Sequence, residues 1–217
     1  YVVKEIAFSP DSTKLAVSQS DCIIFVYNLG HNWGDKKVIC NKFEQNSPIT
    51  AMVWPNKKSH EIFFGIADGK VKLGMLKNNS AQVIYPTNSF VLSLSYNEAN
   101  TSLISGHLDL SVFYHSFDTG VTKKIFTMPS LSYCISYLLN DNFLFATLEK
   151  KIYICDETGH INQIFDYSGH KKLKEFTLCK VNTNFDMVAL GNYNKLFIYS
   201  FNIKLQKWEE SCILDVE

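Results

Sequence analysis

The sequence predicts an all-β fold of the propeller class, built from about five four-stranded sheets. A seven-residue pattern recurs five times, starting at residues 21, 68, 109, 149 and 193, so that successive copies lie 47, 41, 40 and 44 residues apart. Repeats of this length without helical patterns are typical of propeller blades, each of which is one four-stranded sheet. The aromatic share of 14% points the same way, because aromatic side chains favour packed, pleated surfaces.

The recurring heptapeptide predicts one strand in each repeat. Its opening is polar or turn-forming, whereas its fourth and sixth positions are apolar. The fourth positions are Ile24, Val71, Val112, Ile152 and Leu196, and the sixth are Val26, Leu73, Tyr114, Ile154 and Ile198. Alternation with a period of two is the signature of a β-strand.

A second strand is expected before the heptapeptide of each repeat. The runs that predict it are Lys14–Ser18, Glu61–Gly65, Ser102–Gly106, Phe143–Thr147 and Met187–Gly191. They are apolar on successive residues, as strands covered on both faces are. Small, acidic or amide residues follow, such as Ala67-Asp68-Gly69, which accept positive φ angles at low cost and therefore predict a hairpin.

The two remaining strands of each repeat flank this pair. The innermost strands are predicted at Val3–Ser9, Ile49–Trp54, Val91–Tyr96, Tyr133–Tyr137 and Phe176–Val181, and the outermost at Lys36–Cys40, Ala81–Tyr85, Val121–Phe126, Ile161–Asp166 and Trp208–Ile213. The outer strands carry lysines, notably Lys36, Lys37, Lys123 and Lys124, and lysine on an exposed edge discourages aggregation between edges. Each repeat is therefore expected to grade from apolar inside to polar outside.

We expect one domain over residues 1–217, with blades at about 1–47, 48–88, 89–130, 131–173 and 174–217. No helix of ordinary length is expected. The apolar stretch Leu131–Leu139 is ambiguous, but its place in the repeat favours a strand. Because the chain opens on Tyr1 within a strand-like segment, and because WD-type propellers usually close with more blades, we expect a truncated part of a larger propeller.

Composition and charge exclude several classes of protein. Lys+Arg and Asp+Glu are both 21, so the net charge is zero and nothing favours nucleic-acid binding, because nucleic-acid binders usually show a basic excess. The cluster of Lys171, Lys172 and Lys174 is interpreted as a solvated loop. No apolar stretch is long enough for a membrane helix, so no stable membrane insertion is expected. The six cysteines form no C-x-x-C pair, and we expect buried free thiols in a reducing compartment.

The sequence contains no convergent set of catalytic or ligand-binding residues. His107 and Asp109 form a His-x-Asp pair that is compatible with metal binding or catalysis, but a hairpin turn between two strands explains it better. No triad spacing, Gly-rich phosphate loop or pair of carboxylates is found, so we expect no enzyme activity, cofactor, metal or small-molecule substrate. Glu209 and Glu210 are interpreted as a solvated face.

Trp33 is the one residue predicted as a possible partner contact. It lies in the longest connection between strands of a blade, within Gly30-His-Asn-Trp-Gly-Asp35. Exposed aromatic side chains on loops often anchor partners. The alternative is that the ring folds back and caps its own blade.

Longer motifs carry a resemblance to a known family. Phe8-Ser-Pro-Asp-Ser-Thr-Lys14 is a blade opening shared by many WD-type propellers, but the run Asn32-Trp-Gly-Asp-Lys-Lys-Val-Ile-Cys-Asn-Lys-Phe43 is far more specific. Together with Ile23–Tyr27 it resembles the second blade of the intraflagellar transport 172 family. Further similar segments follow in order at Gly65–Lys72, Leu103–Asp109, Gln163–Ser168 and Trp208–Glu210. The resemblance covers nearly the whole chain and is strongest before Phe43.

The resemblance implies a large protein in which WD propellers precede a long helical-repeat tail, with this chain as most of the first propeller. It implies a non-catalytic scaffold subunit of the IFT-B train, whose partners are other train subunits. Its implied locations are the cilium or flagellum, the basal body and the cytoplasm. A vesicle-coat-type or generic WD-repeat adaptor propeller is the alternative, and a propeller enzyme is a third class.

Overall fold

The computed structural model describes residues 1–30, 32 and 34–215. It contains five four-stranded sheets, and the strands of each sheet are hydrogen-bonded in chain order. Every strand pair for which a register is defined is antiparallel. Four consecutive antiparallel strands in one sheet are the architecture of a propeller blade. The predicted fold class, an all-β WD-type propeller with about five blades, is therefore confirmed.

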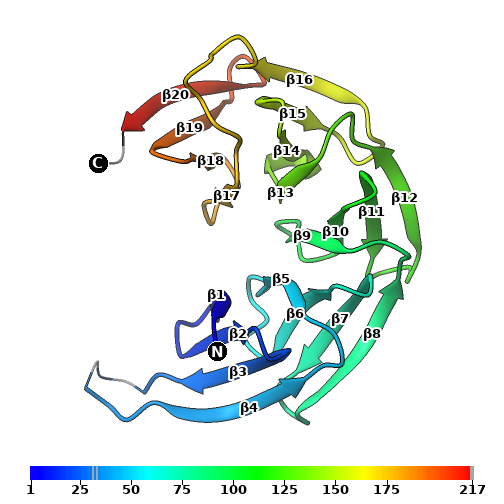
Figure 1. Ribbon diagram of the computed structural model, residues 1–217, viewed down its shortest axis with the longest axis vertical. Coiled ribbons are helices and arrows are strands. Elements are labelled where there is room, and N and C mark those ends of the chain that lie inside the picture. The colour runs from blue at the N-terminus through cyan, green and yellow to red at the C-terminus, as the bar shows by residue number, and fades with distance from the viewer. Residues whose placement is uncertain (31, 33, 216–217) are drawn as a thin grey trace. The chain divides into compact units, whose positions relative to one another are not determined.

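The chain forms two compact units, Tyr1–Leu94 and Ser95–Glu217. The first unit holds the first two sheets (Figure 1, blue to cyan). The strands of the first sheet are β1 (Val3–Phe8), β2 (Lys14–Gln19), β3 (Ile23–Asn28) and β4 (Val38–Glu44), and those of the second are β5 (Ile49–Val53), β6 (Glu61–Ile66), β7 (Lys70–Met75) and β8 (Ser80–Pro86). The expectation of one domain with the stated blade limits stays a prediction.

The second unit holds the fourth and fifth sheets and most of the third, whose first strand, β9 (Val91–Tyr96), crosses the unit boundary. The third sheet continues with β10 (Ser102–His107), β11 (Ser111–Ser116) and β12 (Thr122–Thr127). The fourth contains β13 (Ser132–Tyr137), β14 (Phe143–Thr147), β15 (Lys151–Cys155) and β16 (Ile161–Asp166), and the fifth β17 (Leu178–Val181), β18 (Met187–Asn192), β19 (Lys195–Asn202) and β20 (Lys207–Asp215).

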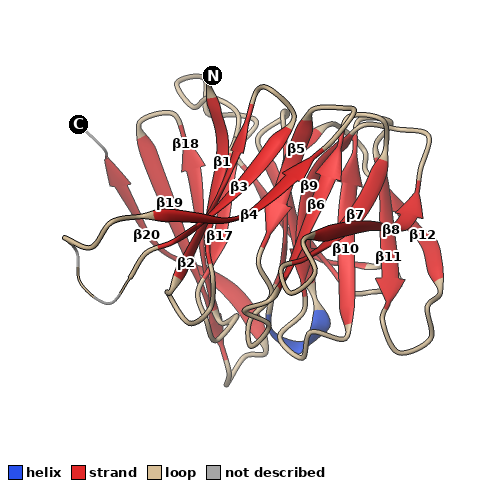
Figure 2. Ribbon diagram, turned by 90° about the horizontal axis from the view of Figure 1, so that it is seen from below, coloured by secondary structure: helices blue, strands red, loops and turns tan. Residues whose placement is uncertain are grey.

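Helix is almost absent from the described residues, as predicted. One short 3-10 helix, η1 (Leu139–Asp141), is drawn in blue among the red strands of Figure 2. The ambiguous stretch before it forms β13, which confirms the strand interpretation. No helix in the described part of the chain has the length and hydropathy that a membrane crossing requires.

Hydrophobic side chains pack between neighbouring sheets. In the first unit, Ile24 and Val26 of β3 share one cluster with Ile62 and Phe64 of β6, and all four are completely buried. In the second unit, one such cluster joins the third and fourth sheets and another joins the fourth and fifth. Burial of apolar surface between sheets is the main favourable term that holds the blades together.

In the first sheet, the apolar inner strand is not buried, unlike the inner strand of a complete gradient from inside to outside. The inner strand β1 exposes Val3, Ile6 and Phe8 by 51%, 59% and 59%. The gradient holds in the fourth sheet, where inner β13 is nearly all buried and outer β16 alternates between exposed and half-buried residues. The difference arises because the fourth sheet contributes to clusters on two sides, whereas β1 contributes only Ala7 to a cluster.

Two strands begin two residues later than predicted. β4 begins at Val38, so Lys36 and Lys37 precede it, and the Lys37 ammonium donates to the Leu29 carbonyl at 2.6 Å. β17 begins at Leu178 because Phe176 instead leaves the ladder and buries its ring against Phe197, with 5.2 Å between ring centroids. The lysines predicted on the outer strand of the third blade, Lys123 and Lys124, do lie in β12.

The cysteine prediction is only partly correct. Cys134 and Cys155 are buried and free, as expected, and Cys22 and Cys179 are half-buried. Cys40 and Cys212 are exposed. Both exposed residues lie on the outermost strands β4 and β20, where alternate side chains face away from the core.

Candidate interaction surfaces

The predicted contact residue Trp33 lies outside the described residues. The structure around it gives only the ends of its loop: Asn32 donates its backbone N–H to Asp35 Oδ2 at 2.9 Å, and the Lys37 ammonium donates to the Leu29 carbonyl. Both interpretations of Trp33, as a partner anchor and as a cap, stay predictions.

The His107–Asp109 pair belongs to a hairpin, as the sequence indicated. His107 ends β10, Asp109 lies in the turn, and its carboxylate accepts the backbone N–H of Ser111 at 3.1 Å. The His107 ring is completely buried, lies 2.7 Å from the equally buried Ser105 hydroxyl, and packs edge-on against Phe113. A side chain sealed in this way stabilises the sheet and is not accessible to a substrate.

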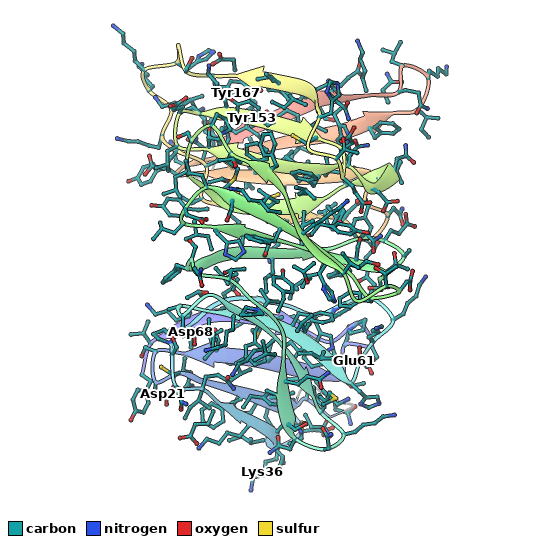
Figure 3. The ribbon with its side chains drawn as sticks, turned by 90° about the vertical axis from the view of Figure 1, so that its right-hand side faces the viewer. Asp21, Lys36, Glu61, Asp68, Tyr153 and Tyr167 are labelled. Atoms are coloured by element: carbon teal, nitrogen blue, oxygen red, sulfur yellow. The ribbon has the colours of Figure 1, made fainter. Side chains whose placement is uncertain are left out.

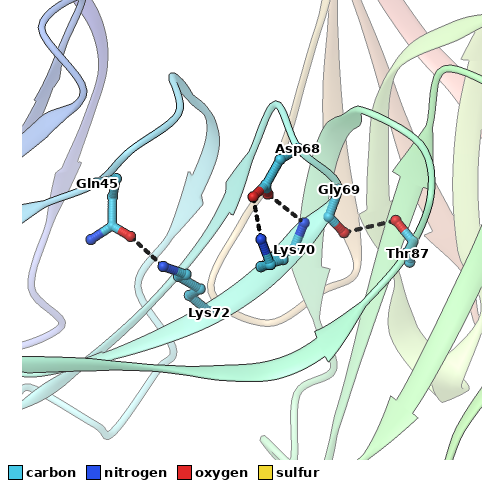
Figure 4. Close-up of polar contacts among 6 residues, drawn as sticks. All are labelled: Gln45, Asp68, Gly69, Lys70, Lys72 and Thr87. Atoms are coloured by element: carbon cyan, nitrogen blue, oxygen red, sulfur yellow. Dashed lines mark hydrogen bonds and ion pairs between the residues drawn. The ribbon is translucent and has the colours of Figure 1, made fainter.

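Among the described residues, no group of three or more His, Cys, Asp or Glu side chains could hold a metal ion. The acidic turn of the second sheet illustrates how such groups are used instead (Figure 4). The Asp68 carboxylate pairs with the Lys70 ammonium and accepts the Lys70 backbone N–H at 3.2 Å. Burial tends to raise the pKa of Asp68, but these bonds outweigh it and lower the pKa. The turn is a structural hairpin.

Gly69 completes this hairpin for steric reasons. Its φ of +92° lies in the region that L side chains rarely adopt, and a Cβ there would collide with the Thr87 carbonyl oxygen. The Thr87 hydroxyl in turn donates to the Gly69 carbonyl at 2.7 Å (Figure 4). This hydrogen bond joins the β6–β7 hairpin to the residue that follows β8.

A groove of about 420 Å³ lies at the other end of the second sheet, beside Glu61 (Figure 3, where Glu61 and Asp68 lie at opposite ends). We call it the Lys57 groove. It is lined by the β5–β6 and β7–β8 loops, including Lys57, His60 and Lys77. Lys58 pairs with Glu61 at 3.1 Å, whereas neither Lys57 nor Lys77 belongs to an ion pair among the described residues.

The loop that lines the Lys57 groove is held by a buried tryptophan. The Trp54 indole N–H donates to the Lys58 carbonyl at 3.0 Å, and the His60 carbonyl accepts the Leu76 backbone N–H at 2.9 Å. Trp54 is 5% exposed. These contacts fix both walls of the groove relative to each other.

A second groove, of about 390 Å³, lies in the second unit beside Tyr167, which Figure 3 labels. We call it the Tyr167 groove. The β16–β17 connection contributes Lys171, Lys172 and Leu173, and the fifth sheet contributes Lys195 and Ile213. It is basic on its rim and apolar within.

Aromatic rings form the base of the Tyr167 groove. Tyr167 packs edge-on against Phe197 at 5.2 Å between ring centroids and against Phe176 at 6.2 Å. Its hydroxyl lies 2.7 Å from the Tyr199 hydroxyl and donates to the Glu210 carboxylate. Burial, followed by this bond to Glu210, raises the pKa of Tyr167 to about 12, so its hydroxyl stays protonated at neutral pH.

A polar network also joins the third and fourth sheets. The Tyr137 hydroxyl is buried, lies 3.0 Å from Ser102 Oγ, and donates to Glu157 Oε1 at 2.9 Å. Burial and the negative charge of Asp141 raise the pKa of Glu157, although the Tyr137 hydrogen bond opposes them. The network stabilises the contact between the sheets.

Sequence reasoning found some of these residues and missed others. It singled out Lys171 and Lys172 as a solvated loop, and the structure brings them next to an apolar groove. It gave no role to Lys57, Lys77 or Glu157. Nothing in their local sequence distinguishes them, because their surroundings come from segments far along the chain.

The five blades, with their hairpins, loop grooves and buried polar residues, define the class of protein: a WD-type propeller that offers surfaces for binding. Comparison with curated proteins gives the family. Intraflagellar transport protein 172 of Chlamydomonas reinhardtii is 40% identical over 219 residues, which is 97% of this chain, and its human homolog is 40% identical over 215 residues. Intraflagellar transport protein osm-1 of Caenorhabditis elegans is 32% identical over the whole chain.

Over the residues compared, the chain belongs to the intraflagellar transport protein 172 family. It spans about an eighth, 12%, of the length of these relatives. No family model matches the sequence.

Proposed function

We propose that the chain is a binding propeller in a non-catalytic scaffold subunit of the intraflagellar transport train. The observation that carries the proposal is 40% identity over 97% of the chain to a protein named for intraflagellar transport. The blades support it physically, because stacked sheets present loops at both ends and need no chemistry to bind partners. The subunit would act in ciliary assembly and in cargo transport along the axoneme.

The partners we propose are other transport subunits, and the locations are the cilium or flagellum, the basal body and the cytoplasm. The two grooves support a role in protein binding, since each is a concavity lined in part by lysines that form no ion pair with another described residue. The closed environment of His107 supports the absence of catalysis at the one His-x-Asp pair. We also propose that residues 1–217 form a single propeller domain with the five blade limits given above.

The test is disruption of the gene in a ciliated cell that expresses the protein, with re-expression of the complete protein as the control. We expect shortened or absent cilia that re-expression restores, and a fluorescently tagged copy should move along the axoneme. Normal cilia together with a secretion defect would overturn the proposal and favour a vesicle-coat adaptor. Proximity crosslinking in the same cells would identify the subunits that contact these loops.

A further inference from the structure

The Tyr167 groove joins two chemical features on one surface, a basic rim and an apolar interior. We propose that this groove binds a short acidic segment of a partner protein, with carboxylates on Lys171 and Lys172 and one apolar side chain against Leu173 and Ile213. This inference rests on the proposed scaffold function, and it specifies the kind of partner that binds to one surface of the scaffold.

The charge of the rim is the first argument. Lys171 and Lys172 are exposed, and neither belongs to an ion pair among the described residues, whereas Lys195 pairs with Asp215. Glu175, the nearest acidic residue along the loop, does not line the groove. The rim therefore carries two positive charges that are complementary to carboxylates of a partner.

The interior of the groove is the second argument. Leu173 is half-buried, and Ile213 is 41% exposed, so both offer apolar surface to a ligand. The volume of about 390 Å³ is at the small end of the range in which proteins hold ligands, and it suits one large side chain with its neighbouring peptide groups. A purely acidic peptide would leave the apolar surface of Leu173 and Ile213 without a contact.

The loop is already held in place, which lowers the cost of binding. The Leu173 backbone N–H donates to the His170 carbonyl at 3.1 Å, and that carbonyl also accepts from the Lys150 ammonium at 3.3 Å. The Lys174 backbone N–H donates to Asn192 Oδ1 at 3.1 Å. A preorganised loop loses less conformational freedom when it binds.

The geometry favours a peptide over other anionic partners. Tyr167, Phe176 and Phe197 pack edge-on against one another, and Phe176 and Phe197 are buried, so this cluster presents no open pair of rings between which a nucleic-acid base could stack. A lipid surface is flat and engages protruding side chains, whereas the apolar surface here lies inside a concavity. Binding to anionic vesicles is therefore tested as a result that would contradict the proposal.

The probe is a fluorescein-labelled peptide that alternates glutamate with leucine, added to the complete protein and followed by fluorescence anisotropy. A peptide with glutamine in place of glutamate is the control for charge. The double variant Lys171→Glu/Lys172→Glu should weaken binding by about tenfold, because two attractive pairs become repulsive. The matched control, Lys57→Glu/Lys77→Glu, changes the net charge equally in the Lys57 groove and should bind as the wild type does.

Leu173→Ser tests the apolar part, and it should weaken binding by a factor of about three to ten while leaving the dependence on salt unchanged. Equal losses in the two double variants, equal binding of the glutamine peptide, or binding only to phosphatidylserine vesicles would each overturn the proposal. If the peptide does not bind but re-expression of the protein restores the cilia, the proposed role of the groove is overturned and the scaffold function is not. Normal cilia after gene disruption overturn the scaffold function whatever the peptide does.

Discussion

Replacement of Leu144 by alanine tests whether the fourth sheet is packed against the fifth. Leu144 is completely buried in β14, opposite Ile154 of β15, and belongs to the cluster that joins the fourth and fifth sheets. The three carbon atoms removed represent about 2.4 kcal/mol of transfer free energy at about 0.8 kcal/mol each. A cavity between two rigid sheets cannot fully close, so the total loss in free energy of unfolding should be about 3–4 kcal/mol.

The assay is urea unfolding followed by tryptophan fluorescence, which is suitable because Trp208 lies in the same cluster as Leu144. The midpoint should fall while the dependence on urea concentration is unchanged. Leu205→Ala is the matched control: Leu205 is 58% exposed between β19 and β20, and its loss should change stability by less than about 0.5 kcal/mol. Equal effects of the two substitutions would refute the packing of β14 against the fifth sheet.

Three further predictions follow from single residues. Gly69→Ala should lower the free energy of unfolding by about 1–3 kcal/mol, because φ is +92° and a Cβ has no room. Gly120→Ala is the control and should cost less, because there is space around Gly120. Similar losses for the two variants in thermal denaturation would contradict this. The raised pKa of Glu157 means that its contribution to stability is present at low pH and is lost as pH rises through the folded-state pKa. Glu157→Gln should therefore flatten the fall in stability that begins above about pH 4.5, and parallel urea-midpoint curves of the two proteins would count against the network. Burial raises the pKa of Cys155 to about 12, so maleimide should label exposed Cys40 in the native protein and leave Cys155 unlabelled until unfolding, as mass spectrometry of the labelled peptides would show.

The fold could be predicted from the sequence because the heptapeptide repeats a local signal. All five copies form the third strand of their sheet, from β3 to β19. Ile24, Val71, Val112 and Ile152 at the fourth position are completely buried. The pattern is local and periodic, so one chain is enough to reveal it.

The fifth repeat shows what the pattern could not distinguish. In β19, the buried residues are Phe197 and Tyr199, while Leu196 and Ile198 of the pattern are only partly buried. Phe197 and Tyr199 face the cluster shared with the fourth sheet, and alternate residues of a strand point to the opposite face. Both faces of β19 carry apolar residues, so the sequence alone does not say which face meets a neighbour.

The binding surfaces were harder to predict for a related reason. The lysines of the Tyr167 groove are visible in the sequence. Its apolar interior, however, combines Leu173 of the β16–β17 loop with Ile213 of β20, which lies 40 residues further along the chain. Trp33 was chosen from its loop alone, and a contact of that kind depends on a partner. Hairpin residues such as Asp68 were predictable because turn chemistry is local.

The most direct test of the account is an experimental structure of the complete protein by electron cryomicroscopy. The account predicts that residues 1–217 form five consecutive four-stranded antiparallel sheets, with β3, β7, β11, β15 and β19 as the third strand of each. Helices at the recurring heptapeptides, or parallel strands in a single open sheet, would contradict it.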